Sequence, residues 1–304
     1  MFRRIGWQRS AHLTAVFQAL FVTFLWSTSW VLIKIGLADI PALTFAGLRY
    51  GLAFLCLLPF FFYSRGVAEV RHLSRTAWLQ LVALGLIYYA VTQGAQFVGL
   101  FYLPAVTVNI MLGFTSIMVA LLGMVLLAER PSSLQWLGIF IAIAGVLLYF
   151  YPLHIPEAQF VGFVVVAVGV LANAGAAVLG RSLNRRGEIR PLTITTVSMG
   201  LGAAVLLIAG LSTQGLPTIN WQSWAVIGWL AVVNTACAFT LWNVSLRTLS
   251  AMESSIINNT MAVQIPILAV IFLGERLNGR QIWGLIIAVV GTLLVQLGRK
   301  RLTL

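Results

Sequence analysis

The side chains of this sequence that could do chemistry are mainly neutral amides and aromatic rings, and they lie within long apolar runs. Tyr89, Gln93 and Gln96 follow i, i+4, i+7 spacing and would share one face of a helix. Other apolar runs hold Trp26, Trp30, Asn109, Asn173, Asn234, Trp242, Asn243, Asn258, Asn259 and Gln264. Amides can hydrogen-bond carboxylate and ammonium groups without a fixed charge, and rings can stack on an apolar side chain. This set predicts the lining of a neutral, aromatic-walled cavity.

Each of these residues also has a structural interpretation. Asn and Gln within a membrane hydrogen-bond across helices, and each such contact contributes about 0.6 kcal/mol on average. A tryptophan can instead belong to the aromatic belt at the membrane surface, as we expect for Trp221 and Trp224. For the amides, binding and structural roles both stay open at this point.

Four residues are expected to act in structure or gating: Arg49, Pro266, Glu129 and Glu275. Arg49 lies within an apolar run, and at that depth its guanidinium needs a substrate carboxylate or backbone carbonyls as a partner. The structural role is the favoured one. Glu129 and Glu275 each precede an apolar run and could stabilise the positive N-terminus of the helix that follows. Pro266 removes a backbone donor and is the expected hinge.

Catalytic and metal chemistry find no support in the sequence. His12, His72 and His154 lie outside the apolar runs, no HExxH motif is present, and Cys56 and Cys237 form no metal-ligand pattern. We therefore expect no enzyme activity, no metal and no cofactor. No Asp or Glu lies in the middle of an apolar run, so we also hypothesise that transport needs no obligatory proton coupling.

The elements that must position these residues are membrane-spanning helices. Of the 304 residues, 60% are hydrophobic and 9% charged, and the mean hydropathy is +0.98. Soluble domains carry about 25% charged residues. Ten apolar segments, each long enough to cross a bilayer as a helix, are expected at about 13–35, 41–63, 77–101, 104–128, 133–151, 160–180, 191–211, 222–246, 250–273 and 278–297. The sequence predicts an all-α integral membrane protein.

The positive charges predict the orientation of these helices. The net charge of +12 is concentrated between apolar runs, which indicates topology and not nucleic-acid binding. With the N-terminus in the cytoplasm, 15 of the 19 basic residues face the cytoplasm. They are Arg3, Arg4, Arg9, Arg65, Arg71, Arg75, Arg130, Arg181, Arg185, Arg186, Arg190, Arg247, Arg299, Lys300 and Arg301. Both termini are therefore expected in the cytoplasm of a bacterial inner-membrane protein.

An internal repeat divides the chain in two. Residues 127–148 and 273–294 are identical at ten of 22 positions at a constant offset of 146, including Glu129/Glu275 and Gly145/Gly291. This offset spans five helices, an odd number, so the two copies must cross the membrane in opposite directions. We expect a cytoplasmic segment at 1–12, repeats at 13–151 and 160–297, and a basic cytoplasmic tail at 298–304.

The paired pattern of a helix, then (L/A)-(G/A)-E-R, then a Gly- and Leu-rich helix resembles the EamA-type repeat of the drug/metabolite transporter superfamily. The segment Trp26-Ser27-Thr28-Ser29-Trp30, followed by Lys34-Ile35-Gly36, resembles that family as well. The resemblance implies ten helices, cytoplasmic termini, and efflux or exchange of amino acids and other metabolites. Within the family, the chain is most similar to bacterial aromatic amino-acid exporters.

The leading hypothesis for function is an alternating-access exporter of amino acids, aromatic or apolar ones first, working by facilitated diffusion or exchange. A multidrug or other metabolite exporter is the alternative, because the same apolar cavity would serve it. An intramembrane enzyme and a channel are distant alternatives. The expected partners are a small-molecule substrate and membrane lipid, with no nucleic acid. The oligomeric state stays open, a monomer included.

Overall fold

A computed structural model describes residues 2–127, 132–152, 156–246, 248–249 and 251–298. Within these residues, ten helical stretches are long and apolar enough to cross a membrane, which confirms the predicted fold class. We number them spans 1 to 10: His12–Gly36, Ala42–Tyr63, Arg75–Tyr102, Ala105–Leu122, Ser133–Phe150, Glu157–Asn184, Pro191–Thr213, Trp221–Trp242, Ile256–Leu273 and Gly279–Leu297.

Six of the spans belong to single α-helices. These helices are α1 (Phe2–Gly36), α2 (Ala42–Tyr63), α8 (Ser133–Phe150), α9 (Glu157–Arg186), α10 (Pro191–Thr213) and α15 (Gly279–Leu297). The short α3 (Gly66–Arg71) lies between spans 2 and 3. Capping boxes start α8 at Ser132 and α15 at Asn278, where each side chain accepts from a backbone N–H of the first turn. The last span of each half therefore begins with the same N-terminal capping motif.

The other four spans are irregular, and the irregularities repeat. Span 3 consists of α4 (Arg75–Leu84), the π-helix η1 (Gly85–Gln93) and α5 (Gly94–Tyr102). Span 8 has the same order and lies in α11 (Trp221–Ala231), the π-helix η2 (Val232–Cys237) and α12 (Ala238–Ser245).

Span 4 lies in α6 (Ala105–Gly113) and α7 (Thr115–Leu127), and span 9 lies in α13 (Ala251–Asn259) and α14 (Met261–Leu273). These two spans are interrupted at Phe114 and Thr260, which lie 146 residues apart. The spacing of the interruptions equals the offset of the sequence repeat.

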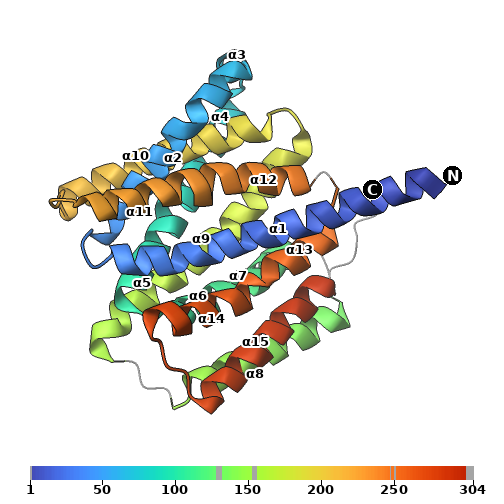
Figure 1. Cartoon of the computed structure of the whole chain (residues 1–304). Coiled ribbons are helices and arrows are strands. Elements are labelled where there is room, and N and C mark those ends of the chain that lie inside the picture. The colour runs from blue at the N-terminus through green and yellow to red at the C-terminus, as the bar shows by residue number, and fades with distance from the viewer. Residues whose placement is uncertain (1, 128–131, 153–155, 247, 250, 299–304) are drawn as a thin grey trace.

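The two five-span halves are inverted relative to each other. Figure 1 shows α1 beginning and α15 ending at the same end of the bundle, which we call the terminal end. The opposite end, where α1 ends and α15 begins, is the distal end. Helix α1 runs from the terminal to the distal end, and α9, which starts the second half, runs the other way.

The last helices of the two halves, α8 and α15, pack on each other along one edge of the molecule (Figure 1). Their contact depends on glycine. A Cβ at Gly138 would lie 2.6 Å from the backbone nitrogen of Val295, and one at Gly284 would lie 2.6 Å from that of Tyr149. The small residues let the two backbones meet directly, as tight packing between membrane helices requires.

Helices α2 and α10 form a second pair, which is joined in its middle and at the terminal end. In its middle, a Cβ at Gly47 would lie 2.8 Å from the backbone nitrogen of Leu207. At the terminal end, the Glu69 carboxylate accepts hydrogen bonds from the Arg190 backbone and guanidinium and from the Thr193 hydroxyl. Burial raises the pKa of the Glu69 carboxyl, but these hydrogen bonds outweigh burial and hold the pKa below its usual value.

The outer surface of the bundle is apolar. Phe17, Phe60, Phe140 and Ile208 are each more than 60% exposed. A soluble protein would not present so many large apolar side chains to water, whereas a bilayer solvates them. This surface agrees with ten spans embedded in lipid.

Candidate functional site

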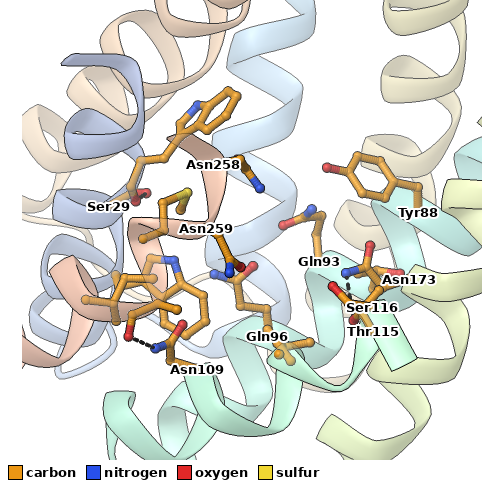
Figure 2. Close-up of a pocket in the computed structure, with 18 of the residues that line it drawn as sticks. Ser29, Tyr88, Gln93, Gln96, Asn109, Thr115, Ser116, Asn173, Asn258 and Asn259 are labelled. Carbon is orange, nitrogen blue, oxygen red and sulfur yellow. Dashed lines mark hydrogen bonds between the residues drawn. The ribbon is translucent and has the colours of Figure 1, made fainter. Parts of the chain in front are cut away.

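A cavity of about 400 Å³ lies between the two halves and is lined by residues from both. Nine of the predicted binding residues line it: Trp26, Trp30, Gln93, Gln96, Asn109, Asn173, Asn234, Asn258 and Asn259. Arg49 also lines it. In Figure 2, Ser29, Asn258 and Asn259 lie across the cavity from Tyr88, Gln93 and Asn173. The lining is therefore mainly amide, hydroxyl and aromatic.

The irregular backbone of four spans lies at this cavity. The π-helices η1 and η2 contribute Gln93 and Asn234, and the interruptions of spans 4 and 9 are flanked by Thr115 and Asn259. Distorted helical backbone at membrane depth is tolerated where it is buried in protein or lines a cavity, and π-helical turns are frequent at functional sites. The distortions therefore mark the site independently of the side chains.

The π-helix η1 explains one difference from the sequence prediction. Tyr88, and not Tyr89, lines the cavity. The spacing i, i+4, i+7 assumes a regular α-helix, whereas η1 adds a residue per turn and places Tyr88 and Gln93, five apart, on the cavity side. Tyr89 is buried behind them, with its ring 5.6 Å from that of Tyr50. The prediction of Tyr89 as a lining residue is wrong for this reason.

Two threonine hydroxyls donate hydrogen bonds to backbone carbonyls of the π-helical turns. Thr92 donates to the Ile87 carbonyl at 2.9 Å, and Thr235 donates to the Leu230 carbonyl at 2.8 Å, each five residues back. Because the Thr235 proton is used in this way, its oxygen is left to accept from other groups. The lining also includes Tyr50, whose hydroxyl donates to Gln93 Oε1 at 2.6 Å.

Asn234 and Trp26 join the two halves beside the cavity. The Trp26 indole N–H donates to the backbone carbonyl of Asn234 at 3.1 Å, and Asn234 Nδ2 donates to the backbone carbonyl of Leu25. The Trp26 ring lies 5.3 Å from the Phe239 ring and 5.2 Å from the Trp242 ring. Trp26 and Phe239 face the cavity, whereas Trp242 packs behind them and does not line it.

Asn109 compensates for Pro266. A proline cannot donate to the carbonyl four residues earlier, so Pro266 frees the Ala262 carbonyl within α14. Asn109 Nδ2 donates to that carbonyl at 3.2 Å (Figure 2). Span 9 runs through Pro266 as helix and is interrupted at Thr260 instead. The backbone irregularity expected from Pro266 therefore lies six residues earlier.

Gln264, a further predicted binding residue, does not line the cavity. Gln264 accepts from the Ser27 hydroxyl at 2.8 Å and donates to Thr260 at 3.0 Å, which fastens span 9 to span 1. Its role is the interhelical hydrogen bonding weighed as the alternative. The side chain of Asn243 and the whole of Glu129 lie outside the described residues.

Arg49 enters the cavity from the middle of α2 with few partners. Its Nε and Nη2 both donate to Thr235 Oγ1 at 3.4 Å, and its guanidinium carbon lies 5.2 Å from the centre of the Tyr50 ring. The backbone-carbonyl partners considered from the sequence are not among its contacts in the described chain. Among the described residues there is also no cluster of three His, Cys, Asp or Glu side chains that could hold a metal ion.

The distal end of the bundle is closed. The Glu275 carboxylate accepts from the backbone N–H groups of Ala105 at 2.5 Å and Val106 at 3.1 Å, at the start of α6. Lys34 Nζ donates to the Leu103 carbonyl at 2.7 Å, just before that helix. Glu275 thus stabilises the N-terminus of a helix in the other half and not of the helix that follows it, contrary to the sequence prediction.

Apolar packing shows the same asymmetry between the ends. One continuous buried cluster reaches the distal end and includes Ile33, Leu37, Ile40 and Leu103. At the terminal end, two separate clusters occur: one around Leu81, Leu183 and Ile194, the other around Ala15, Ala19, Leu249 and Ile257. The cavity lining continues along α15 to Gln296, close to the terminal end. The cavity therefore extends toward the terminal end.

Comparisons with known proteins agree with this architecture. The EamA-like transporter family matches residues 13–151 and 160–297. The chain is 27% identical to the uncharacterized transporter YyaM of Bacillus subtilis over 82% of each chain. It is 25% identical to a "probable amino-acid metabolite efflux pump" of Salmonella typhimurium, over 90% of this chain and 92% of that one.

It is also 25% identical to the uncharacterized inner membrane transporter YedA of Escherichia coli, over 96% of this chain and 94% of that one. A solved crystal structure matches with a TM-score of 0.66 and 16% identity, over 96% of this chain and 100% of that chain. This last likeness shows the fold alone.

Ten apolar spans, two inverted halves and a polar cavity between them define a multi-pass membrane transporter. The chain belongs to the EamA-like transporter family. The family resemblance inferred from the paired Glu-Arg motif is thereby confirmed, and a place in the inner membrane agrees with the relatives.

Proposed function

We propose that this protein exports amino acids, aromatic and apolar ones foremost, by alternating access. The observation that carries the proposal is the cavity between the inverted halves, with amides for the polar groups of an amino acid and Trp26, Trp30 and Phe239 for its side chain. Relatives described as probable amino-acid metabolite efflux pumps are consistent with this choice.

The proposed orientation places the terminal end in the cytoplasm. Arg65, Arg71, Arg75 and Arg190 lie at that end, as the positive-inside rule requires. The cavity would then face the cytoplasm and take up substrate from it, with the distal end closed. Rearrangement of the two halves around the same cavity would open the distal end and release the substrate outside.

The lining also supports a proposal for the driving force. No Asp or Glu lines the cavity among the described residues, so a carboxylate that could carry a proton with the substrate is not found there. The substrate's own gradient, or exchange for another substrate, would drive net movement.

Counterflow in liposomes tests the function. Liposomes containing the purified protein and loaded with unlabelled phenylalanine should accumulate labelled phenylalanine without a proton gradient. A panel of unlabelled amino acids and cationic drugs should show competition by aromatic and apolar amino acids. Competition by cationic drugs in place of amino acids would support the multidrug alternative, which the aromatic wall would also serve.

A further inference from the structure

Arg49 is the only charged residue among the described residues that line the cavity. It is 6% exposed and lies between Gly47 and Gly51, where α2 meets α10. A guanidinium has five N–H donors, and here one hydroxyl, that of Thr235, receives two of them at the long distance of 3.4 Å. A cation held at this depth with so few partners is costly unless an anion or water completes its contacts.

The residue before Thr235 in η2 offers a neutral acceptor. Asn234 precedes Thr235, and its Nδ2 donates to the Leu25 carbonyl, which can only accept. This contact fixes the amide orientation and leaves Oδ1 as the free end. Asn234 Oδ1 is buried and has no hydrogen-bond partner in the described chain. The unpartnered oxygen of Asn234 thus lies on η2, one residue before Thr235. Thr235 is the residue that the Arg49 guanidinium contacts.

We infer that Arg49 binds the carboxylate of the substrate and that Asn234 Oδ1 accepts from its ammonium group, so that the carboxylate is required and the ammonium group is not. The inference rests on the proposed function and specifies the substrate class of the same cavity. The carboxylate meets a full opposite charge, which favours bidentate hydrogen bonds. The ammonium group meets a neutral oxygen and no carboxylate, which is a weaker interaction.

The substrate class that follows is the monocarboxylates with an apolar or aromatic side chain, with or without an α-amino group. Trp26 and Phe239, on the same side of the cavity as Asn234, would contact that side chain. A cationic amine without a carboxylate is excluded, because it would place a second positive charge beside Arg49.

Three compounds that share the same aromatic group separate the contribution of the carboxylate from that of the ammonium group. Phenylalanine carries both, 3-phenylpropionate lacks the ammonium group, and phenethylamine lacks the carboxylate. Against labelled phenylalanine counterflow, 3-phenylpropionate should compete within about tenfold of phenylalanine, and phenethylamine at least about 100-fold more weakly. Phenethylamine competing as well as 3-phenylpropionate would overturn the inference while leaving amino-acid transport intact.

Binding can also be measured without transport, from the rise in melting temperature of the purified protein with each compound. If phenylalanine fails to show counterflow, the proposed function fails, yet the ranking of the three compounds by thermal shift still decides the role of Arg49. No thermal shift with either carboxylate would overturn the inference too.

Variants connect the ranking to Arg49. In Arg49→Gln, the advantage of 3-phenylpropionate over phenethylamine should disappear, and in Arg49→Lys it should persist at lower affinity. Arg280→Gln is the matched control, because Arg280 lies over the Tyr151 ring outside the cavity. A purely structural Arg49 would weaken all three compounds equally, and an unchanged ranking in Arg49→Gln would refute the assignment.

Discussion

Glu275 should act as a latch for the distal end, because it joins the second half of the chain to the start of a helix in the first. Its carboxylate accepts from two backbone N–H groups, those of Ala105 and Val106. Opening the distal end between the halves would separate these atoms. Glu275→Gln keeps the shape of the side chain and removes its charge, so it weakens the closed state in particular.

The size of the effect follows from the two hydrogen bonds. A hydrogen bond to a charged group contributes about 1.5–3 kcal/mol and one between neutral groups about 0.5–1.5 kcal/mol. The two bonds to the Glu275 carboxylate together contribute about 3–6 kcal/mol, and Gln, which can still accept one N–H through Oε1, would keep about 0.5–1.5 kcal/mol, so the closed state should lose at least about 1.5 kcal/mol. Because about 1.4 kcal/mol is a factor of ten, the population open at the distal end should rise at least about tenfold.

Cysteine labelling measures this population. Cys56 and Cys237 are replaced by serine, and Leu37, which is 7% exposed in the distal apolar cluster, is changed to cysteine. An impermeant maleimide added outside right-side-out vesicles should react at least about tenfold faster in Glu275→Gln than in the parent.

Glu157→Gln is the control for the latch, because Glu157 is an exposed glutamate in the first turn of α9 at the same distal end. This variant should leave the labelling rate unchanged. An unchanged rate in Glu275→Gln as well would show that the Glu275 contacts persist when the distal end opens, and the latch would be refuted.

Three further predictions concern the framework around the cavity. Asn109→Leu should lower the free energy of unfolding by about 1 kcal/mol, seen as a lower melting temperature. The loss should shrink in a Pro266→Ala background, because the alanine at that position can then donate to the Ala262 carbonyl. Equal losses in both backgrounds would contradict this. Glu69→Gln should be less stable than the parent at pH 7. The difference in stability should disappear as the pH falls below 4.5 and through the lowered pKa of Glu69, as measured by thermal melts across pH. A difference that stays constant with pH would refute this prediction. Gly138→Val should lower the free energy of unfolding by about 1–3 kcal/mol, because the new side chain meets the backbone of α15. Gly175→Ala should be tolerated, because a Cβ there meets no atom within 4 Å. Equal melting temperatures for the two variants would be evidence against the tight packing.

Much of the fold could be predicted from the sequence, because a membrane imposes strong rules. A bilayer of fixed thickness requires apolar runs of about 20 residues, so the positions of the apolar runs located the ten spans. The Glu275 and Gly291 pairings at offset 146 then indicated two halves, and five spans per half required the inversion. The interruptions at Phe114 and Thr260 repeat that offset in the backbone.

The cavity could be predicted in its chemistry but only partly in its residues. Amides and tryptophans in apolar runs must face the interior or one another, and the sequence does not say which. Gln264 forms hydrogen bonds with Ser27 and Thr260, whereas Gln96, with the same side chain, lines the cavity. That choice depends on which groups lie opposite in the packed bundle.

Local helix geometry was the other limit. The π-helix η1 turns Tyr88 toward the cavity and Tyr89 away, and hydropathy carries no signal for an extra residue in a turn. The partner of Glu275 was equally hidden, because the helix that it caps belongs to the other half of the chain. Contacts between distant segments decide both cases.

Accessibility of one cavity residue from both sides of the membrane tests the central claim most directly. Gln96 lines the cavity, and Gln96→Cys in a background without other cysteines places a reporter there. An impermeant maleimide should label it in inside-out and in right-side-out vesicles, and phenylalanine should slow both reactions. Labelling from one side only, under every substrate condition, would contradict a single cavity that opens alternately to the two compartments.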